Sequence, residues 1–141
     1  MSKIYWDTML FVYLLEGSPQ YSPKVAKIYT AMQQRGDRLY SSALAKGEIL
    51  IKPLQQERPG RADAVEDFFA PENVTLLSFS ASTARKYAEI RAQWKVRPPD
   101  AIHLACAAEA GIDLFLTNDQ ALIGKHVEGI QFIAGLDVNL F

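Results

Sequence analysis

Short apolar runs alternate with longer amphipathic segments along the whole chain. Apolar runs that are typical of strands occur at residues 4–6, 39–42, 74–79, 114–116 and 130–133. Between these runs, apolar side chains recur every three or four residues, which predicts helices. The expected helices span residues 8–15, 22–36, 44–54, 62–69, 80–94 and 98–111, with one further helical turn at 121–124.

The segment at residues 98–111 carries the strongest helical signal. Ala101, Leu104 and Ala108 share one face of such a helix, and further apolar positions widen that face, so most of the helix should be buried. Two prolines open the segment and a glycine closes it, as is common at helix termini. A continuous apolar run follows at 114–116, which is typical of a parallel strand that is covered on both faces.

The regular alternation of strands and helices predicts an α/β fold. Strands joined through helices run parallel and are connected by right-handed crossovers, which gives a three-layer helix/sheet/helix sandwich. The sequence has no internal repeat, low-complexity segment or linker. We therefore expect residues 1–141 to form a single domain with a central, mainly parallel sheet.

Composition narrows the classes of function. The net charge is −1, so the chain as a whole is not a strongly basic nucleic-acid binder, although local basic patches remain open. The single cysteine, Cys106, fits a reducing, cytoplasmic environment. The longest apolar run, residues 9–15, is too short to span a bilayer, and it lacks the flanks of a signal peptide.

Four acidic residues occupy positions that differ from those of ordinary surface residues. Asp7 and Asp119 each follow a predicted strand, Asp100 begins the apolar helix, and Glu48 interrupts an otherwise apolar helix. In open parallel sheets, strand ends and the following helix starts meet at the edge where ligands bind. We therefore expect these four carboxylates to converge on one site.

Converging carboxylates require a compensating cation. Buried like charges repel, and they are costly unless an ion or hydrogen bonds offset them. Oxygen-only ligands favour Mg²⁺ or Mn²⁺ over zinc. Such ions can lower the pKa of a bound water and stabilise charge on a phosphate, which is the chemistry of phosphodiester hydrolysis.

Each acid also has an ordinary structural interpretation. Asp7 and Asp119 could cap the segments that follow them, Asp100 could lie at a helix start because of the helix dipole, and Glu48 could face solvent. Only the joint placement of the four residues supports a site.

Four short motifs resemble those of the PIN-domain family, and within it the VapC-like toxins of toxin–antitoxin pairs. They are YWDT at residues 5–8, SSALAKGE at 41–48, PPDAIHLACA at 98–107 and FLTND at 115–119, in the order of that family. The sequence is therefore identified as similar to this family over nearly its whole length.

The resemblance implies a fold, an activity and partners. It implies a five-stranded parallel sheet between helices and a Mg²⁺- or Mn²⁺-dependent endoribonuclease. It implies that Asp7, Glu48, Asp100 and Asp119 hold the metal and that Thr117 supports the last of these acids. The family further implies a cognate antitoxin protein and a homodimer.

Other polar and aromatic residues are candidates for supporting roles. Lys46, Lys52 and Arg97 are expected to contact the RNA backbone, because phosphates need nearby cations. Trp94 is a candidate for stacking on a base. His103 is best interpreted as a structural histidine that is hydrogen-bonded in the core.

Two other classes of function remain open from the residues alone. A haloacid dehalogenase-type phosphatase also has an acid after its first strand, but it expects a second acid two residues later, where this chain has Met9. A non-catalytic PIN-like RNA-binding module would have lost its metal site, whereas all four acids are present here. No Walker loop, dinucleotide glycine pattern or zinc motif occurs.

Overall fold

The structure, a computed structural model, describes residues 1–139, so the predicted domain of residues 1–141 extends two residues past the described part. Its centre is a five-stranded sheet with the strand order β3-β2-β1-β4-β5. Every neighbouring pair in this sheet is parallel. The strands are β1 (Lys3–Trp6), β2 (Arg38–Ser42), β3 (Thr75–Leu77), β4 (Ile112–Leu116) and β5 (Ile130–Ala134).

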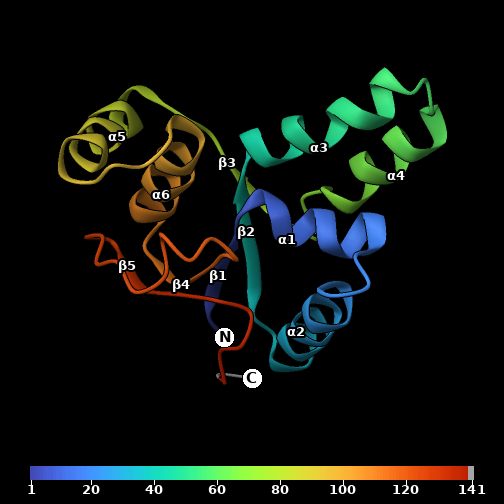
Figure 1. The fold of residues 1–141 in the computed structure, drawn as a ribbon, viewed down its shortest axis with the longest axis horizontal. Coiled ribbons are helices and arrows are strands. Elements are labelled where there is room, and N and C mark those ends of the chain that lie inside the picture. Colours follow the sequence, from blue (N-terminus) through green and yellow to red (C-terminus); the bar gives the residue numbers. More distant parts are fainter. Residues whose placement is uncertain (140–141) are drawn as a thin grey trace.

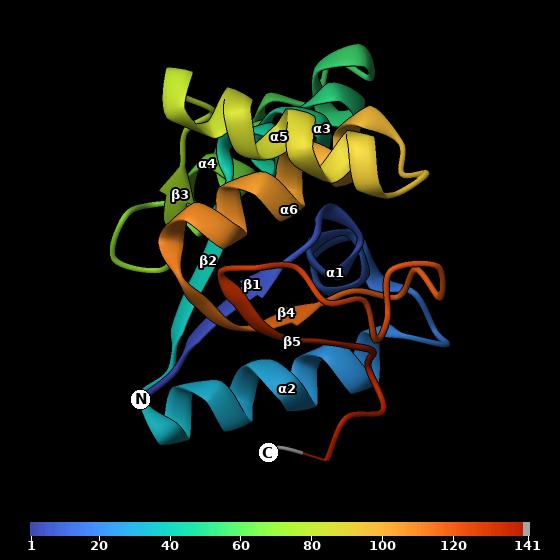
Figure 2. The same cartoon turned by 90° about the vertical axis from the view of Figure 1, so that its left-hand side faces the viewer.

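Helices cover both faces of this sheet (Figures 1 and 2). One core cluster joins the sheet to α1–α4, and a second joins it to α5 and α6. The predicted three-layer α/β/α sandwich is therefore confirmed. The helical elements are α1 (Thr8–Val12), the π-helical turn η1 (Tyr13–Gly17), α2 (Ser22–Arg35), α3 (Ala43–Gln55), α4 (Pro59–Phe68), α5 (Ala81–Gln93) and α6 (Pro98–Ala110).

The side chains of β1 show how one strand serves both layers. Ile4 and Trp6 belong to the cluster beneath α1–α4, whereas Tyr5 between them belongs to the cluster beneath α5 and α6. This alternation follows from the two-residue period of a strand. All three side chains are buried, as expected for a central strand.

Helix α6 is buried on most of its surface, as its sequence predicts. Seven of its residues are buried, among them Ala101, Leu104 and Ala108. Gly111 ends the helix in the left-handed conformation, with φ of 67°, which glycine adopts without steric cost. The acidic residue in its first turn is Asp100, so the packing of α6 fixes the position of that carboxylate.

Asp7 caps α1, as its ordinary structural interpretation predicts, because its side chain accepts a hydrogen bond from the Met9 N–H. Two local predictions differ from the structure. The third strand is shorter than predicted and spans Thr75–Leu77. Residues 121–124 form a hydrogen-bonded turn and not a helical turn. The Gly124 N–H in this turn donates to the Ile133 carbonyl of β5, and this bond ties the turn to the sheet.

Within residues 1–139, no helix is both long and apolar enough to cross a membrane.

Gly129 gives a test of the packing between α6 and the turn before β5. Its φ is +100°, and a Cβ atom there would lie 2.4 Å from the Ala108 carbonyl oxygen. We expect Gly129→Ala to lower the free energy of unfolding by about 2–4 kcal/mol, because it adds backbone strain and a clash with backbone. Urea denaturation measures this change.

Gly60→Ala is the matched control for that substitution. Gly60 lies in α4, where an added Cβ has no neighbour within 4 Å. The control should keep or raise the stability, by up to about 1 kcal/mol. Equal stability of Gly129→Ala and the wild type would contradict the packing described here.

Candidate functional site

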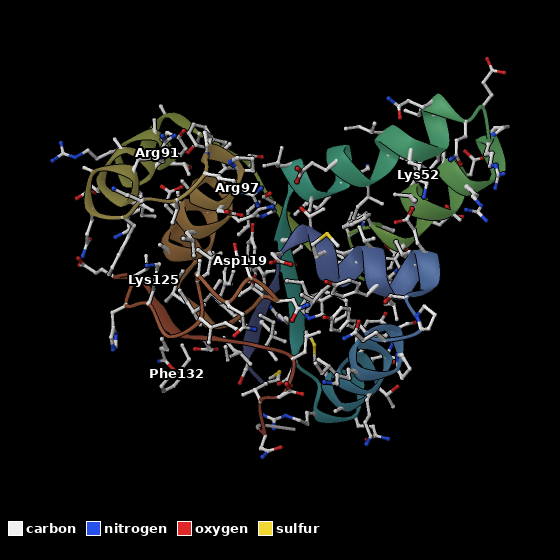
Figure 3. All side chains as sticks on the ribbon, viewed as in Figure 1. Lys52, Arg91, Arg97, Asp119, Lys125 and Phe132 are labelled. Atoms are coloured by element: carbon white, nitrogen blue, oxygen red, sulfur yellow. The ribbon has the colours of Figure 1, made fainter. Side chains whose placement is uncertain are left out.

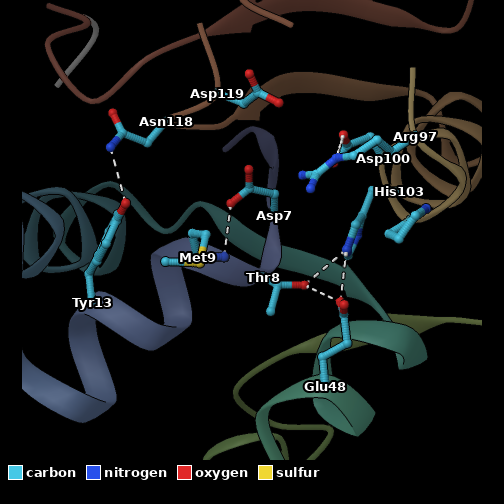
Figure 4. Close-up of a pocket in the computed structure, with 11 residues that line it drawn as sticks. Asp7, Thr8, Met9, Tyr13, Glu48, Arg97, Asp100, His103, Asn118 and Asp119 are labelled. Carbon is cyan, nitrogen blue, oxygen red and sulfur yellow. Dashed lines mark hydrogen bonds and ion pairs between the residues drawn. The ribbon is translucent and has the colours of Figure 1, made fainter. Parts of the chain in front are cut away.

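An open pocket of about 340 Å³ lies at the carboxyl ends of the central strands (Figure 4). All four acids that the sequence singles out contribute to its walls. The lining residues are Asp7, Thr8, Met9, Tyr13, Glu48, Arg97, Pro99, Asp100, His103, Asn118 and Asp119.

The order of the strands brings these acids together from distant parts of the chain. β1 and β4 are neighbours with Trp6 opposite Leu116, so the residues that follow each strand leave the sheet side by side. The Asp7 N–H donates to the Leu116 carbonyl over 3.2 Å, which extends this pairing by one residue. The site therefore forms at the edge where parallel α/β sheets bind ligands.

Asp7 is the most constrained of the four carboxylates. Its Oδ1 accepts a hydrogen bond from the Met9 N–H over 3.1 Å, and the Thr117 hydroxyl donates to its Oδ2. Burial nevertheless raises the pKa of Asp7 above its usual value, while Thr117 and the Met9 amide act in the opposite direction. An ionised Asp7 is thus under-compensated, and a cation in the pocket would offset this cost.

Thr117 connects Asp7 with the loop that carries Asp119. Its side chain is fully buried. While its hydroxyl donates to Asp7, its oxygen accepts a hydrogen bond from the Asp119 N–H over 3.0 Å. The residue therefore fixes two acids with one hydroxyl group, which fits the supporting role that the family resemblance implies.

Glu48 reaches the pocket from α3 and is held by Thr8. The Thr8 hydroxyl donates to Glu48 Oε1 over 2.7 Å, and the His103 Nε2 atom lies 3.7 Å from the same oxygen. His103 and the Thr8 hydroxyl both hold the pKa of Glu48 below its usual value. Because 3.7 Å is too long for a hydrogen bond, we assign the effect of His103 to electrostatic attraction.

His103 is the centre of a hydrogen-bonded chain that ends at Glu48. The Tyr5 hydroxyl lies 2.7 Å from His103 Nδ1, and the Thr8 hydroxyl lies 3.0 Å from Nε2. Burial raises the pKa of Tyr5, so its hydroxyl keeps its proton. Thr8 gives its only proton to Glu48, so its oxygen accepts from Nε2–H of His103. Both ring nitrogens of His103 thus have a hydroxyl partner, and the ring is fixed in orientation between Tyr5 and Thr8.

Arg97 brings a positive charge into this acidic pocket. Its Nε atom lies 3.3 Å from Asp100 Oδ2, and Figure 4 shows the guanidinium group pointing toward the middle of the pocket. The Arg97 side chain is 79% exposed, so the ion pair is easily exchanged for another partner. Of the three basic residues that the sequence singles out, Arg97 is the one that lines the pocket.

The structure does not bring the other two predicted RNA-contacting residues to the pocket. Lys46 forms an ion pair with Glu66 of α4, and the Lys52 Nζ atom lies 3.5 Å from Glu16 Oε1. Figure 3 shows Lys52 on the α3–α4 side of the molecule, whereas Arg97 lies on the α5–α6 side. Both lysines are therefore explained as charges on a helix face that is exposed to solvent, which is the ordinary interpretation of such residues.

The ordinary structural roles of the acids coexist with their place in the pocket. Asp7 caps α1, Asp100 lies in the first turn of α6, and Asp119 Oδ1 accepts a hydrogen bond from the Ala121 N–H over 2.9 Å. Capping occupies one oxygen or lone pair of a carboxylate and leaves others available. These roles therefore position the acids without excluding them from binding a cation.

The residues around the pocket suit a hard, hydrated cation. Within residues 1–139, no three His, Cys, Asp or Glu side chains stand in a ready-made metal-binding group. Four carboxylates nevertheless share a pocket of about 340 Å³, and this volume has room for water molecules between them. Mg²⁺ keeps several waters and needs only one or two direct carboxylate ligands, so a wide, oxygen-only set fits it better than a closed cage would.

Sequence reasoning missed Thr8 and Tyr5 as parts of the site. The sequence pattern places Thr8 only in a predicted helix and Tyr5 only in a predicted strand. Their partners lie far away in the sequence: Tyr5 and His103 are 98 positions apart, and Thr8 and Glu48 are 40 positions apart. The one local signal was the position of Thr8 directly after a candidate metal ligand.

Comparison with protein families gives one match that covers most of the chain. The family model described as PIN domain matches residues 4–125. Comparison with curated protein sequences gave no significant match.

Solved structures of low sequence identity share the fold. VapBC2 from Rickettsia felis, bound to a DNA fragment from its promoter, aligns with a TM-score of 0.72 and 14% identity, covering 94% of this chain and 98% of that chain. A toxin–antitoxin complex from Klebsiella pneumoniae gives 0.65 and 17%, with 91% and 95% covered. FitAcB from Neisseria gonorrhoeae gives 0.66 and 17%, with 84% and 88% covered.

The raised pKa of Asp7 predicts how its removal affects stability. At neutral pH the ionised, buried carboxylate costs stability, because its pKa in the folded protein lies above the unfolded value. We expect metal-free Asp7→Asn to melt at the same or a higher temperature than the wild type at pH 7. This advantage should vanish as the pH falls toward about 4, where the unfolded carboxyl group also becomes neutral.

Thermal melts in EDTA between pH 4 and pH 8 measure this dependence. Asp63→Asn, which removes an exposed carboxylate of α4, gives the baseline for the loss of one negative charge. A clear drop in the melting temperature of Asp7→Asn at pH 7 would show that its hydrogen bonds outweigh its burial.

Proposed function

This chain belongs to the PIN domain family, and we propose that it is a Mg²⁺- or Mn²⁺-dependent endoribonuclease, the toxin of a toxin–antitoxin pair. Members of this family are generally nucleases, which hydrolyse phosphodiester bonds. The observation that carries the proposal is the joint presence of Asp7, Glu48, Asp100 and Asp119 in the walls of one pocket.

The electrostatics of the pocket favour a cation over a protonated acid cluster. Burial makes an ionised Asp7 costly, while the environment of Glu48 keeps that residue ionised. The pKa of Asp7 is raised whereas the pKa of Glu48 is lowered. Protonation at pH 7 therefore does not neutralise all four carboxylates. A divalent cation balances the charge and leaves every carboxylate available as an oxygen ligand.

Several residues of the chain would bind such an ion or support the residues that bind it. Asp7, Glu48, Asp100 and Asp119 would hold it. When bound, Mg²⁺ or Mn²⁺ supplies positive charge to the phosphate and lowers the pKa of a water molecule. Thr117 holds Asp7 and the Asp119 loop in place.

His103 acts at a distance from the substrate. Its ring is almost fully buried, and its contacts with Tyr5 and Thr8 occupy both ring nitrogens. It is therefore a positioning residue, which orients Thr8 so that the Thr8 hydroxyl can hold Glu48.

Similar structures support the proposed partners. Two of them are a toxin–antitoxin complex from Klebsiella pneumoniae and VapBC2 from Rickettsia felis. We propose a cognate antitoxin for this chain as well, and a homodimer, as the family resemblance implies. A neighbouring reading frame for a small DNA-binding protein that blocks the activity on co-expression would support the antitoxin.

The central prediction concerns cleavage of RNA. Labelled single-stranded RNA should be cut in Mg²⁺ and left intact in EDTA. Asp7→Asn and Asp100→Asn should each lower the rate at least about 100-fold, because they weaken the hold on the ion. Hydrolysis by water needs no 2′-hydroxyl, so the products should carry 5′-phosphate ends, which end-group analysis detects.

Asp63→Asn is the control for this assay, because its carboxylate lies on α4 outside the pocket. Full activity of both pocket variants would refute the site. RNA binding without cleavage would favour the non-catalytic module, and cleavage of a phosphomonoester in place of RNA would favour the phosphatase.

A second prediction tests the link between Thr8 and Glu48. Thr8→Val removes the hydroxyl that holds Glu48, so we expect cleavage and Mg²⁺ affinity to fall about 10- to 100-fold. Thr8→Ser keeps the hydroxyl and should restore most of both. Titration calorimetry measures the Mg²⁺ affinity independently of cleavage. If Thr8→Ser is as impaired as Thr8→Val, the methyl group and not the hydroxyl is what matters.

A further inference from the structure

A second cavity, of about 460 Å³, lies beside the acidic pocket, and its walls are basic. Arg91, Lys95 and Arg97 contribute their side chains, and no acid is among the lining residues of the described chain. We name this cavity the basic cleft; its walls are formed by Arg91, Trp94, Lys95, Val96, Arg97 and Pro98. For a chain with a net charge of −1, this is a strong local excess of positive charge.

The segment between α5 and α6 directs the side chains of Lys95 and Arg97 toward solvent. Trp94 and Arg97 have extended backbone angles, with ψ of 148° and 152°. Val96 is buried in the core cluster beneath α5 and α6. Because side chains alternate along an extended segment, a buried Val96 directs Lys95 and Arg97 to the surface, and both are exposed.

A fourth cation lies next to the basic cleft. The Lys125 Nζ atom lies 4.2 Å from the centroid of the Trp94 ring, a cation–π contact. This contact occupies a face of the indole, so Trp94 is better suited to holding Lys125 than to stacking on a base. Figure 3 shows Arg91, Arg97 and Lys125 on the same side of the molecule.

Arg97 belongs to both cavities. It lines the acidic pocket and the basic cleft, so the two cavities adjoin at this side chain. A polyanion that places one phosphate in the acidic pocket is repelled there by the carboxylates unless a cation is bound. Its neighbouring phosphates would meet Arg91, Lys95 and Arg97, of which Arg97 is paired with Asp100.

We propose that the basic cleft binds the backbone of single-stranded RNA next to the bond that is cut, which rests on the proposed function. A single strand is flexible enough to place one phosphate near Asp7 and the following phosphates near Arg97. A duplex is too rigid to enter both cavities in this way. The cleft contacts phosphates by charge, so it contributes affinity and strand direction and does not read bases.

The test measures RNA binding without catalysis. Fluorescence anisotropy in EDTA follows a labelled uridine RNA of about 15 nucleotides, long enough to span both cavities. We expect Arg91→Ala/Lys95→Ala to raise the Kd about tenfold. The variant should also reduce the slope of log Kd against log salt concentration by about 1 to 2, because two phosphate contacts are lost.

Two matched variants separate a specific site from general charge and from damage to the fold. Lys27→Ala/Arg38→Ala removes the same charge from α2 and the start of β2, at positions that line neither cavity, and should bind as the wild type does. Arg91→Lys/Lys95→Arg keeps both charges and should also bind normally. Thermal melts confirm that all variants fold.

The outcomes keep the two proposals apart. If Arg91→Ala/Lys95→Ala has the same Kd and the same salt dependence as the wild type, the proposed role of the basic cleft is wrong, even if the protein cuts RNA in Mg²⁺. Absence of RNA binding by the wild type both in EDTA and in Mg²⁺ would overturn it as well. RNA binding that depends on Arg91 and Lys95, without cleavage in Mg²⁺, would support the cleft and refute the nuclease.

Discussion

The burial of a carboxylate, that of Asp7, is the constraint around which this site is organised. β1 and β4 are adjacent and parallel, so their ends deliver Asp7 and the loop of Asp119 to the same place. The Thr117 hydroxyl and the Met9 amide stabilise Asp7 there. Burial still raises the pKa of Asp7, which means that hydrogen bonds alone do not compensate its charge. The proposed cation would supply the compensation that this buried carboxylate lacks.

The architecture and the location of the site are predictable from the sequence because their signals are local. A strand is recognised by its apolar run, and a helix such as α6 by its periodicity and its proline and glycine termini. Parallel sheets then place the residues after strands at one edge by a general rule. Asp7 comes directly after β1, and Asp119 comes three residues after the end of β4, so their meeting in one pocket follows from topology without knowledge of any side-chain contact.

The details inside the site are not predictable in this way, because they depend on register and on side-chain geometry. The chain Tyr5–His103–Thr8–Glu48 joins four elements, and a shift of one residue in β1 would turn Tyr5 to the other face of the sheet. Lys46 looked close to the site because it is near Glu48 in sequence. On a helix, however, residues two apart point in different directions, and Lys46 pairs with Glu66 of α4.

Net charge was an equally poor guide, because the charges of this chain are separated in space. The net charge of −1 is the sum of opposite charges that lie apart, in an acidic pocket and in a basic cleft that adjoin at Arg97. Arg97 pairs with Asp100 and supplies part of the positive charge of the acidic pocket. If an ion were bound by Asp100 as proposed, Arg97 would lose this partner, and a phosphate would be a strong anionic partner for its exposed guanidinium group. The proposed binding of a divalent cation and the proposed binding of a phosphate backbone would then be linked through Arg97.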